Sequence, residues 1–133
     1  MKNPISKLRI QQFEKLLSKL KQFSSPTNED EETLFIKNFE IAYELTFKTL
    51  FLIYLASNSQ PLPTKKDVIR WAFKFKLIKN TDDWFNFIDI RNETVHEYLA
   101  NEIYARLPLI LKFLPNFKYL ISKLKKVNEN STF

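Results

Sequence analysis

The segment that is most informative about the fold reads NEDEETLFIKNFEIAYELTFKTLFLIYLA and covers residues 28–56. Its hydrophobic side chains cover most sides of a helical wheel, and as a helix it would be about 43 Å long. A helix that is apolar on most sides is buried by its neighbours, so this segment predicts the central helix of the protein. We expect it to be capped by Thr27, because Asp30 follows three residues later in capping-box spacing and acidic residues suit the positive end of a helix.

Helical spacing of apolar residues continues on both sides of this segment. We expect further helices over about residues 5–23, over 64–75, from Asn80 to about 99, and from Glu102 onward. Short loops between long helices make neighbouring helices antiparallel. The predicted fold is therefore all-α, an up-and-down antiparallel four-helix bundle with an additional short helix.

Local signals mark where several of these helices begin or break. Thr64 and Asp67 have the spacing of a capping box, and Asn80 can cap the helix that follows it. Pro108 and Pro115 must bend or interrupt the last helix, because proline lacks an N–H and crowds the carbonyl four residues before it.

The composition excludes several classes of enzyme. The 133 residues include no glycine, no cysteine and one histidine. Glycine-rich phosphate loops, nucleophile elbows, cysteine nucleophiles and cysteine–histidine zinc sites are therefore impossible within one chain. We expect no cofactor and no metal, since Asp82 and Asp83, the most suggestive acidic pair, are explained as residues at a helix start.

Length and charge describe one basic domain. We expect a single domain over residues 1–133, with a tail at 128–133 that frays. The net charge of +6 favours an anionic partner through counterion release, although a solvated lysine-rich surface explains the charge as well. The chain shows neither a signal peptide nor an apolar stretch long enough for a bilayer, so we expect a cytoplasmic protein with no membrane contact.

The densest set of functional side chains is DIRNETVHEY, residues 89–98. On a helix, Asp89, Asn92 and His96 share one face, with Arg91 one position round. A guanidinium can hold a phosphate and an imidazole can move a proton near neutral pH, which is the minimum for metal-independent cleavage of RNA. One arginine and one histidine make a thin site, so this hypothesis requires two copies across a symmetric dimer.

A structural interpretation accounts for the same residues. His96 can cap the end of its helix, and Arg91 can pair with Asp89 or with a carboxylate of the bundle such as Glu44. Residue chemistry alone favours this interpretation, because structural ion pairs use the same residue types. Glu44 is also expected to pair with Lys48, four residues on, although it could instead orient Arg91.

Four aromatic residues invite a base-stacking interpretation: Trp71, Phe73, Phe75 and Trp84. Their helical spacing favours the core or a dimer interface instead, with Trp71 and Phe75 as the exposed pair. An exposed aromatic patch on a bundle usually marks a protein partner.

Four segments taken together resemble one known family. They are NFEIAYELTFK at 38–48, DVIRWAFKFKLI at 67–78, RNETVHEY at 91–98 and EIYAR at 102–106. In this order they are similar to the HEPN superfamily, specifically its nucleotidyltransferase substrate-binding branch, which carries an Arg-x4-His motif. The resemblance covers about residues 8–125.

This resemblance implies a helical bundle that forms a homodimer and binds a separate small nucleotidyltransferase. In related HEPN toxins the Arg and His of the motif belong to an RNA-cleaving site, and the nucleotidyltransferase acts as antitoxin by modifying a tyrosine just after the His. By position, these roles fall on Arg91, Asn92, His96 and Tyr98. The substrate-binding branch has another interpretation, in which the bundle presents a substrate to its partner's active site.

Two expectations follow from the resemblance. The first is a non-catalytic substrate-binding subunit of a two-component, toxin–antitoxin-like nucleotidyltransferase system, with RNA or a nucleotide as a further ligand. The alternative is a metal-independent endoribonuclease that uses Arg91 and His96 across the homodimer, with Asn92, Asp89 and Glu44 in support. The chain lacks the glycines and paired acids of a nucleotidyltransferase, so we do not expect that activity in it.

Two residues depart from the pattern of this family. Phe47 stands where tryptophan is common, which is a mild change if the position is in the core. Lys76 stands where a glycine usually ends a helix. A left-handed lysine there would cost about 1 kcal/mol more than glycine, unless the turn differs.

Overall fold

All regular structure is helical within residues 5–58, 63–94 and 105–130, which are the parts of the chain that the computed structural model describes. The helices are α1 (Lys7–Gln22), α2 (Glu29–Ser57), α3 (Lys65–Lys74), α4 (Thr81–Thr94), α6 (Leu107–Leu111) and α7 (Phe113–Asn130). The predicted all-α class is confirmed. No helix within these ranges is long and apolar enough to cross a membrane.

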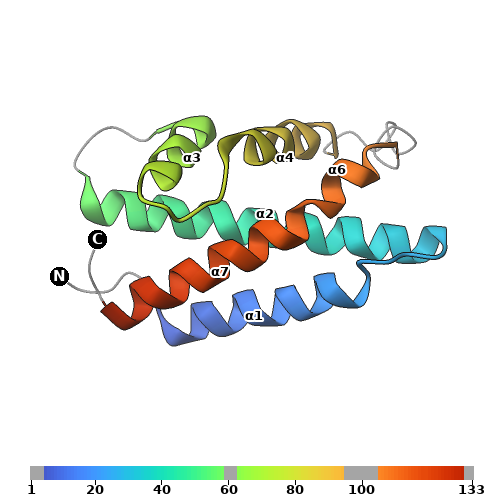
Figure 1. Ribbon diagram of the computed structural model, residues 1–133, viewed down its shortest axis with the longest axis horizontal. Coiled ribbons are helices and arrows are strands. Elements are labelled where there is room, and N and C mark those ends of the chain that lie inside the picture. The colour runs from blue at the N-terminus through green and yellow to red at the C-terminus, as the bar shows by residue number, and fades with distance from the viewer. Residues whose placement is uncertain (1–4, 59–62, 95–104, 131–133) are drawn as a thin grey trace.

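Helix α2 runs through the length of the molecule, with α1 on one side of it, α3 and α4 on the other, and α7 crossing in front (Figure 1). Followed from blue to red, the chain reverses direction from α1 to α2, and α4 runs opposite to both α2 and α7. Helix α1 contacts α2 and α7, and α4 contacts α3, α6 and α7. The four main helices of the bundle are therefore α1, α2, α4 and α7, and α3 and α6 are additional short helices in the described part of the chain.

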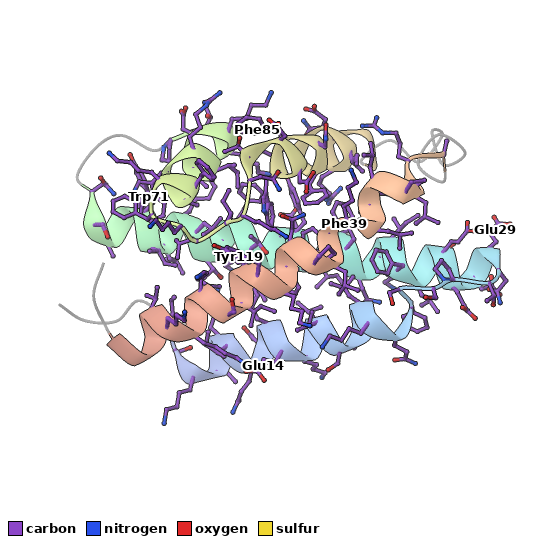
Figure 2. All side chains as sticks on the ribbon, in the orientation of Figure 1. Glu14, Glu29, Phe39, Trp71, Phe85 and Tyr119 are labelled. Atoms are coloured by element: carbon purple, nitrogen blue, oxygen red, sulfur yellow. The ribbon has the colours of Figure 1, made fainter. Side chains whose placement is uncertain are left out.

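Aromatic side chains of α2 form the centre of the core. Phe39 packs edge-on against Phe113 of α7, with ring centroids 5.0 Å apart, and Phe47 packs edge-on against Trp84 of α4 at 6.2 Å. Figure 2 shows Phe39 where α7 crosses α2. Each large ring buries 150–250 Å² or so of surface, so these contacts dominate the packing of α4 and α7 on α2. The burial predicted for Trp84 is confirmed.

The first cap differs from the prediction by one residue. Asn28, not Thr27, is the N-cap of α2, and its side chain accepts a hydrogen bond from the backbone N–H of Glu31. The carboxylate of Glu31 in turn accepts hydrogen bonds from the backbone N–H and the hydroxyl of Thr27. Asparagine caps a helix at least as well as threonine, and here the longer Glu31 can reach back, so the reciprocal pattern is shifted by one position.

The caps of α3 and α4 follow the prediction. Thr64 and Asp67 form a complete capping box at the start of α3. The side chain of Asn80 accepts a hydrogen bond from the backbone N–H of Asp83 at 2.8 Å. Asn116 of α7 donates to the Asp83 carboxylate at 2.9 Å, so this cap also joins α4 to α7.

The last helical region is interrupted, as its prolines require. Lys112 separates α6 from α7, Pro108 lies in the first turn of α6, and Pro115 lies in the first turn of α7. A proline in a first turn removes an N–H that would have had no helical partner. Helix α7 continues to Asn130, so it extends into the 128–133 tail that was expected to fray.

Helix α3 ends on a left-handed lysine. Lys76 has φ 61°, the only positive φ among the described residues. The N–H of Lys76 donates to the carbonyl of Phe73 at 3.0 Å, and the N–H of Leu77 donates to the carbonyl of Ala72 at 2.9 Å. These two bonds make a Schellman motif, which usually carries glycine at the left-handed position. The turn therefore keeps the geometry that glycine would serve, with lysine in its place.

The exposed aromatic pair differs from the prediction. Phe73 and Phe75 are 49% and 48% exposed, whereas Trp71 is half-buried. Trp71 packs between Tyr54 of α2 and Phe75, with ring centroids 5.4 and 5.3 Å away. The wide indole faces α2 because it buries more apolar surface there than a phenyl ring would.

Candidate functional site

Helices α4 and α2 bring the first half of the predicted site together. Arg91 lies near the end of α4, and the neighbouring Ile90 is fully buried. Burial of Ile90 and of Phe87, one turn earlier, sets the rotation of α4 about its axis. As a result the Arg91 side chain lies against α2.

Arg91 contacts two carboxylates of α2. Its Nη1 lies 3.4 Å from Oε2 of Glu40, and its Nε lies 3.3 Å from Oε1 of Glu44. The Arg91 side chain is 22% exposed, so water screens these ion pairs only in part. Both distances exceed the 2.7–2.9 Å or so of short charge-assisted hydrogen bonds, so the guanidinium is shared between two acids and not clamped by one.

This arrangement selects among the predicted partners of Arg91. Glu44 contacts it, as expected for a carboxylate that could orient it. Asp89 and Asn92 lie on exposed positions of α4, and no Asp89–Arg91 ion pair is present among the described side chains. The expected ion pair of Glu44 with Lys48 is wrong for the described part of α2, because Glu44 faces Arg91 on α4.

The other two predicted site residues, His96 and Tyr98, lie outside the described residues. Their placement relative to Arg91 stays a prediction.

Sequence reasoning missed Glu40, although a signal for it exists. Glu40 and Glu44 are four residues apart and therefore neighbours on one face of α2. Two like charges in this spacing destabilise a helix unless a cation lies between them. The pair of acids thus indicates a cation from another helix, and Arg91 supplies it.

A buried phenol and a lysine lie beside this cluster. The Nζ of Lys65 donates to the hydroxyl of Tyr43 at 3.3 Å and lies 4.9 Å from the centre of its ring. Burial, followed by the negative charge of Glu44, raises the pKa of the Tyr43 phenol above its ordinary value. Tyr43 therefore stays protonated at neutral pH and serves as a hydrogen-bond acceptor for Lys65.

The surface around Arg91 is a series of shallow grooves along α2. One groove is lined by Arg91, Lys37, Glu40, Ile41 and Glu44. Ile41 also lines the two adjoining grooves, one toward α1 and one toward α3. Such open grooves suit the surface of a macromolecule better than a small substrate, which proteins usually enclose in a deep pocket.

No group of three or more histidine, aspartate or glutamate side chains in the described ranges could hold a metal ion. The carboxylates nearest Arg91 are engaged by its guanidinium. The described part of the site therefore supplies two cations, Arg91 and Lys37, together with two acids and an adjoining apolar surface.

Known proteins are similar to most of this chain. Residues 7–126 match the protein family described as "Nucleotidyltransferase substrate binding protein like". A protein of Haemophilus influenzae named "Probable ribonuclease HepT" is 32% identical over 98 residues, which are 71% of this chain and 67% of that protein. A solved structure from the same organism, described as revealing the fold of a substrate binding domain of a nucleotidyltransferase, has a TM-score of 0.69 and 25% identity. That likeness covers 87% of this chain and 98% of the other.

Proposed function

Because the chain belongs to the family of nucleotidyltransferase substrate binding protein-like domains, we propose that it is the non-catalytic partner subunit of a separate small nucleotidyltransferase. The family resemblance inferred from the sequence is thereby confirmed. In this proposal the bundle presents a substrate to its partner, in a toxin–antitoxin-like pair.

The ion pairs of Arg91 are the observation that carries this proposal. A substrate phosphate that binds an arginine must compete with any carboxylate already bound to that guanidinium. Here two carboxylates, of Glu40 and Glu44, lie within 3.4 Å of one guanidinium. Both carboxylates already occupy the guanidinium, which supports a structural and presenting role for Arg91 over phosphate binding.

The direct test is co-expression with the product of the reading frame beside this gene, followed by co-purification. A stable complex with a small nucleotidyltransferase is expected. The variant His96→Ala should keep its affinity for that partner, because a pure binding subunit does not need the imidazole. A neighbouring frame that encodes no nucleotidyltransferase, or one whose product does not bind, would contradict the proposal.

Modification of Tyr98 gives a second readout of the same pairing. In this reaction the Tyr98 oxygen would form a bond to the α-phosphorus of a nucleoside triphosphate, with loss of the hydroxyl proton and release of pyrophosphate. Incubation with the partner and nucleoside triphosphates should then raise the intact mass of this chain by one or more nucleotidyl groups. Tyr98→Phe is expected to abolish that increase while leaving the complex intact. An equal increase in Tyr98→Phe would assign the modification to another residue.

A metal-independent ribonuclease is the second candidate function. It is favoured by the similarity to a protein named a probable ribonuclease and by the exposed part of the Arg91 guanidinium, which lines a surface groove. In this hypothesis Arg91 stabilises the phosphorus centre and His96 moves the proton, with two copies of the chain completing the site. A phosphate would then have to replace Glu40 or Glu44 at the guanidinium.

The groove supports one position for the interface of such a dimer. Ile41 is 47% exposed and lines the groove that contains Arg91. Two copies that meet at Ile41 would bring their two Arg91 side chains to one interface, and burial of the aliphatic surface would supply the driving force.

Cleavage of a mixed RNA substrate in excess EDTA distinguishes the two functions. If the protein is a ribonuclease, the wild type cleaves the RNA, and Arg91→Ala and His96→Ala each lower the activity by about 100-fold or more. Both variants must remain folded for this comparison. Lys118→Gln, which removes an exposed cation of α7, is the matched control and should cleave normally. Wild-type cleavage no faster than that of the variants would leave the binding subunit as the function.

A further inference from the structure

A second surface, remote from Arg91, combines exposed rings with positive charge. We call it the α3-end patch and define it as Phe73, Lys74, Phe75, Lys76 and Lys79. Both phenylalanine side chains are about half-exposed, at 49% and 48%. Large aromatic side chains are usually more buried than this, so a pair of them at one helix end indicates a surface that is used.

One ring of the patch, that of Phe75, is held in place by the residues beneath it. Phe75 packs on Trp71, with ring centroids 5.3 Å apart, and Trp71 packs edge-on against Tyr54 of α2 at 5.4 Å. Figure 2 shows Trp71 between the end of α3 and α2. A ring supported in this way can be covered by a flat ligand with little loss of conformational entropy.

The charge around these rings is positive. Between Asp67 and Asp82 the chain carries four cations and no acid. The first of them, Arg70, pairs with Asp67 at 3.1 Å. The other three, Lys74, Lys76 and Lys79, are exposed, and no ion pair joins any of them to another residue within the described ranges.

The lysine at position 76 is the most informative of these. A cation near a helix C-terminus is favoured by the helix dipole, which is enough to explain Lys74 in the last turn of α3. The dipole does not explain a non-glycine residue at φ 61°, where any side chain strains the backbone. Strain of this kind collects at functional sites, so it supports a use for the Lys76 side chain.

We propose that the α3-end patch binds single-stranded nucleic acid. Half-exposed rings that alternate with lysines along the chain match the two needs of such a ligand, since bases stack on aromatic faces and phosphates contact cations. The exposed rings favour this ligand over an acidic protein segment, because such a segment would contact the lysines but would not need a stacking surface.

This site is distinct from the Arg91 site. Helix α4 begins at Thr81, just after the patch, and Arg91 follows ten residues later, about 15 Å along the helix axis. The patch therefore extends the interaction surface beyond the function proposed above and does not depend on whether Arg91 is catalytic.

The test is fluorescence anisotropy with labelled oligouridylate and oligothymidylate of about 12 nucleotides, at about 50 mM salt. The double variant F73L/F75L keeps apolar side chains and removes both rings. It should bind at least about tenfold more weakly than wild type, because each stacked base is worth roughly fivefold or more. Comparison of the two oligonucleotides shows whether the patch prefers ribose. Leu52→Ala, which shortens another exposed apolar side chain, should bind like wild type.

The lysines make a separate contribution to the test. Lys74→Gln and Lys76→Gln should each reduce the slope of log affinity against log salt by about 0.7. Lys76→Gly should bind more weakly than wild type even though its turn is less strained. Normal melting temperatures of all variants are needed to exclude unfolding.

Several outcomes would overturn the proposal. These are equal affinity of F73L/F75L and wild type, equal affinity for a duplex of the same length, or no binding of either oligonucleotide. Tighter binding of a labelled polyglutamate peptide than of the oligonucleotides would assign the patch to an acidic protein partner instead.

Discussion

The guanidinium of Arg91 on α4 lies 3.3 Å from the carboxylate of Glu44 on α2, a residue more than 40 positions earlier in the chain, and so joins the two helices. Glu40, one turn before Glu44 on α2, contacts the same guanidinium, with its Oε2 3.4 Å from Nη1 of Arg91. Arg91, a residue of the family motif, therefore also links two helices of the bundle through ion pairs. Its structural role and its chemical role must be measured separately.

Arg91→Ala should lower the free energy of unfolding by about 1–2 kcal/mol, because it leaves Glu40 and Glu44 as neighbouring like charges in a partly buried place. Glu40→Gln added to Arg91→Ala should recover part of that loss. Urea unfolding of the single and double variants measures both effects. Arg70→Ala is the matched control, since its ion pair with Asp67 is more than half-exposed and should contribute little to stability. Equal losses in Arg70→Ala and Arg91→Ala would refute the structural role.

Lys76→Gly should stabilise the protein by about 1 kcal/mol, because glycine adopts the left-handed conformation without a clash of its side chain. The control is Lys74→Gly, two residues earlier and inside α3, which should destabilise by a similar amount. Thermal unfolding of the three proteins is the measurement. A lower melting temperature for Lys76→Gly would mean that the lysine side chain stabilises the turn.

The capping box of α3 should make stability depend on pH. The hydrogen bonds from Thr64 lower the pKa of the Asp67 carboxyl below its ordinary value. A lowered folded-state pKa contributes stability that is present above the unfolded-state pKa and is lost as the pH falls through the folded-state value. Asp67→Asn should therefore be less stable than wild type at pH 6, and the difference should shrink below about pH 4. A difference that is constant between pH 6 and pH 2 would exclude the carboxylate as its source.

Ile41→Glu should convert a dimer of this protein into monomers, if two copies meet at the groove that holds Arg91. A glutamate at the centre of an apolar interface loses its hydration on association, and in a two-fold interface it also faces its own copy. Light scattering after size-exclusion chromatography reports the mass. Leu52→Glu changes an equally exposed residue of α2 outside the three grooves and should stay dimeric. A dimeric Ile41→Glu variant would place the interface elsewhere.

Much of this structure could be predicted because its signals are local. The apolar wheel of residues 28–56 predicts a central helix, and α2 is that helix. The capping box of Thr64 and Asp67, which needs only a spacing of three, is present as predicted. The cap of α2 moved from Thr27 to Asn28 because two good caps stand side by side, and only the reach of Glu31 chooses between them.

Contacts between helices were predicted less well. Glu44 was expected both beside Lys48 and beside Arg91, and the rotation of α4, set by burial of residues such as Ile90, selects Arg91. The exposed pair of aromatic residues is Phe73 and Phe75 because the wide ring of Trp71 fills the space against Tyr54.

The amino-acid sequence was sufficient for the all-α class, the positions of most helix ends, the family and the absence of glycine- or cysteine-dependent chemistry, since each follows from spacing or composition along the chain. The bundle packing decided that Glu40 and Glu44 share Arg91, that Ile41 lies beside it and that Phe73 and Phe75 face the solvent. These contacts depend on how the helices rotate about their axes to bury their largest side chains together. The spacing of apolar residues along one helix does not determine which residues of another helix it contacts.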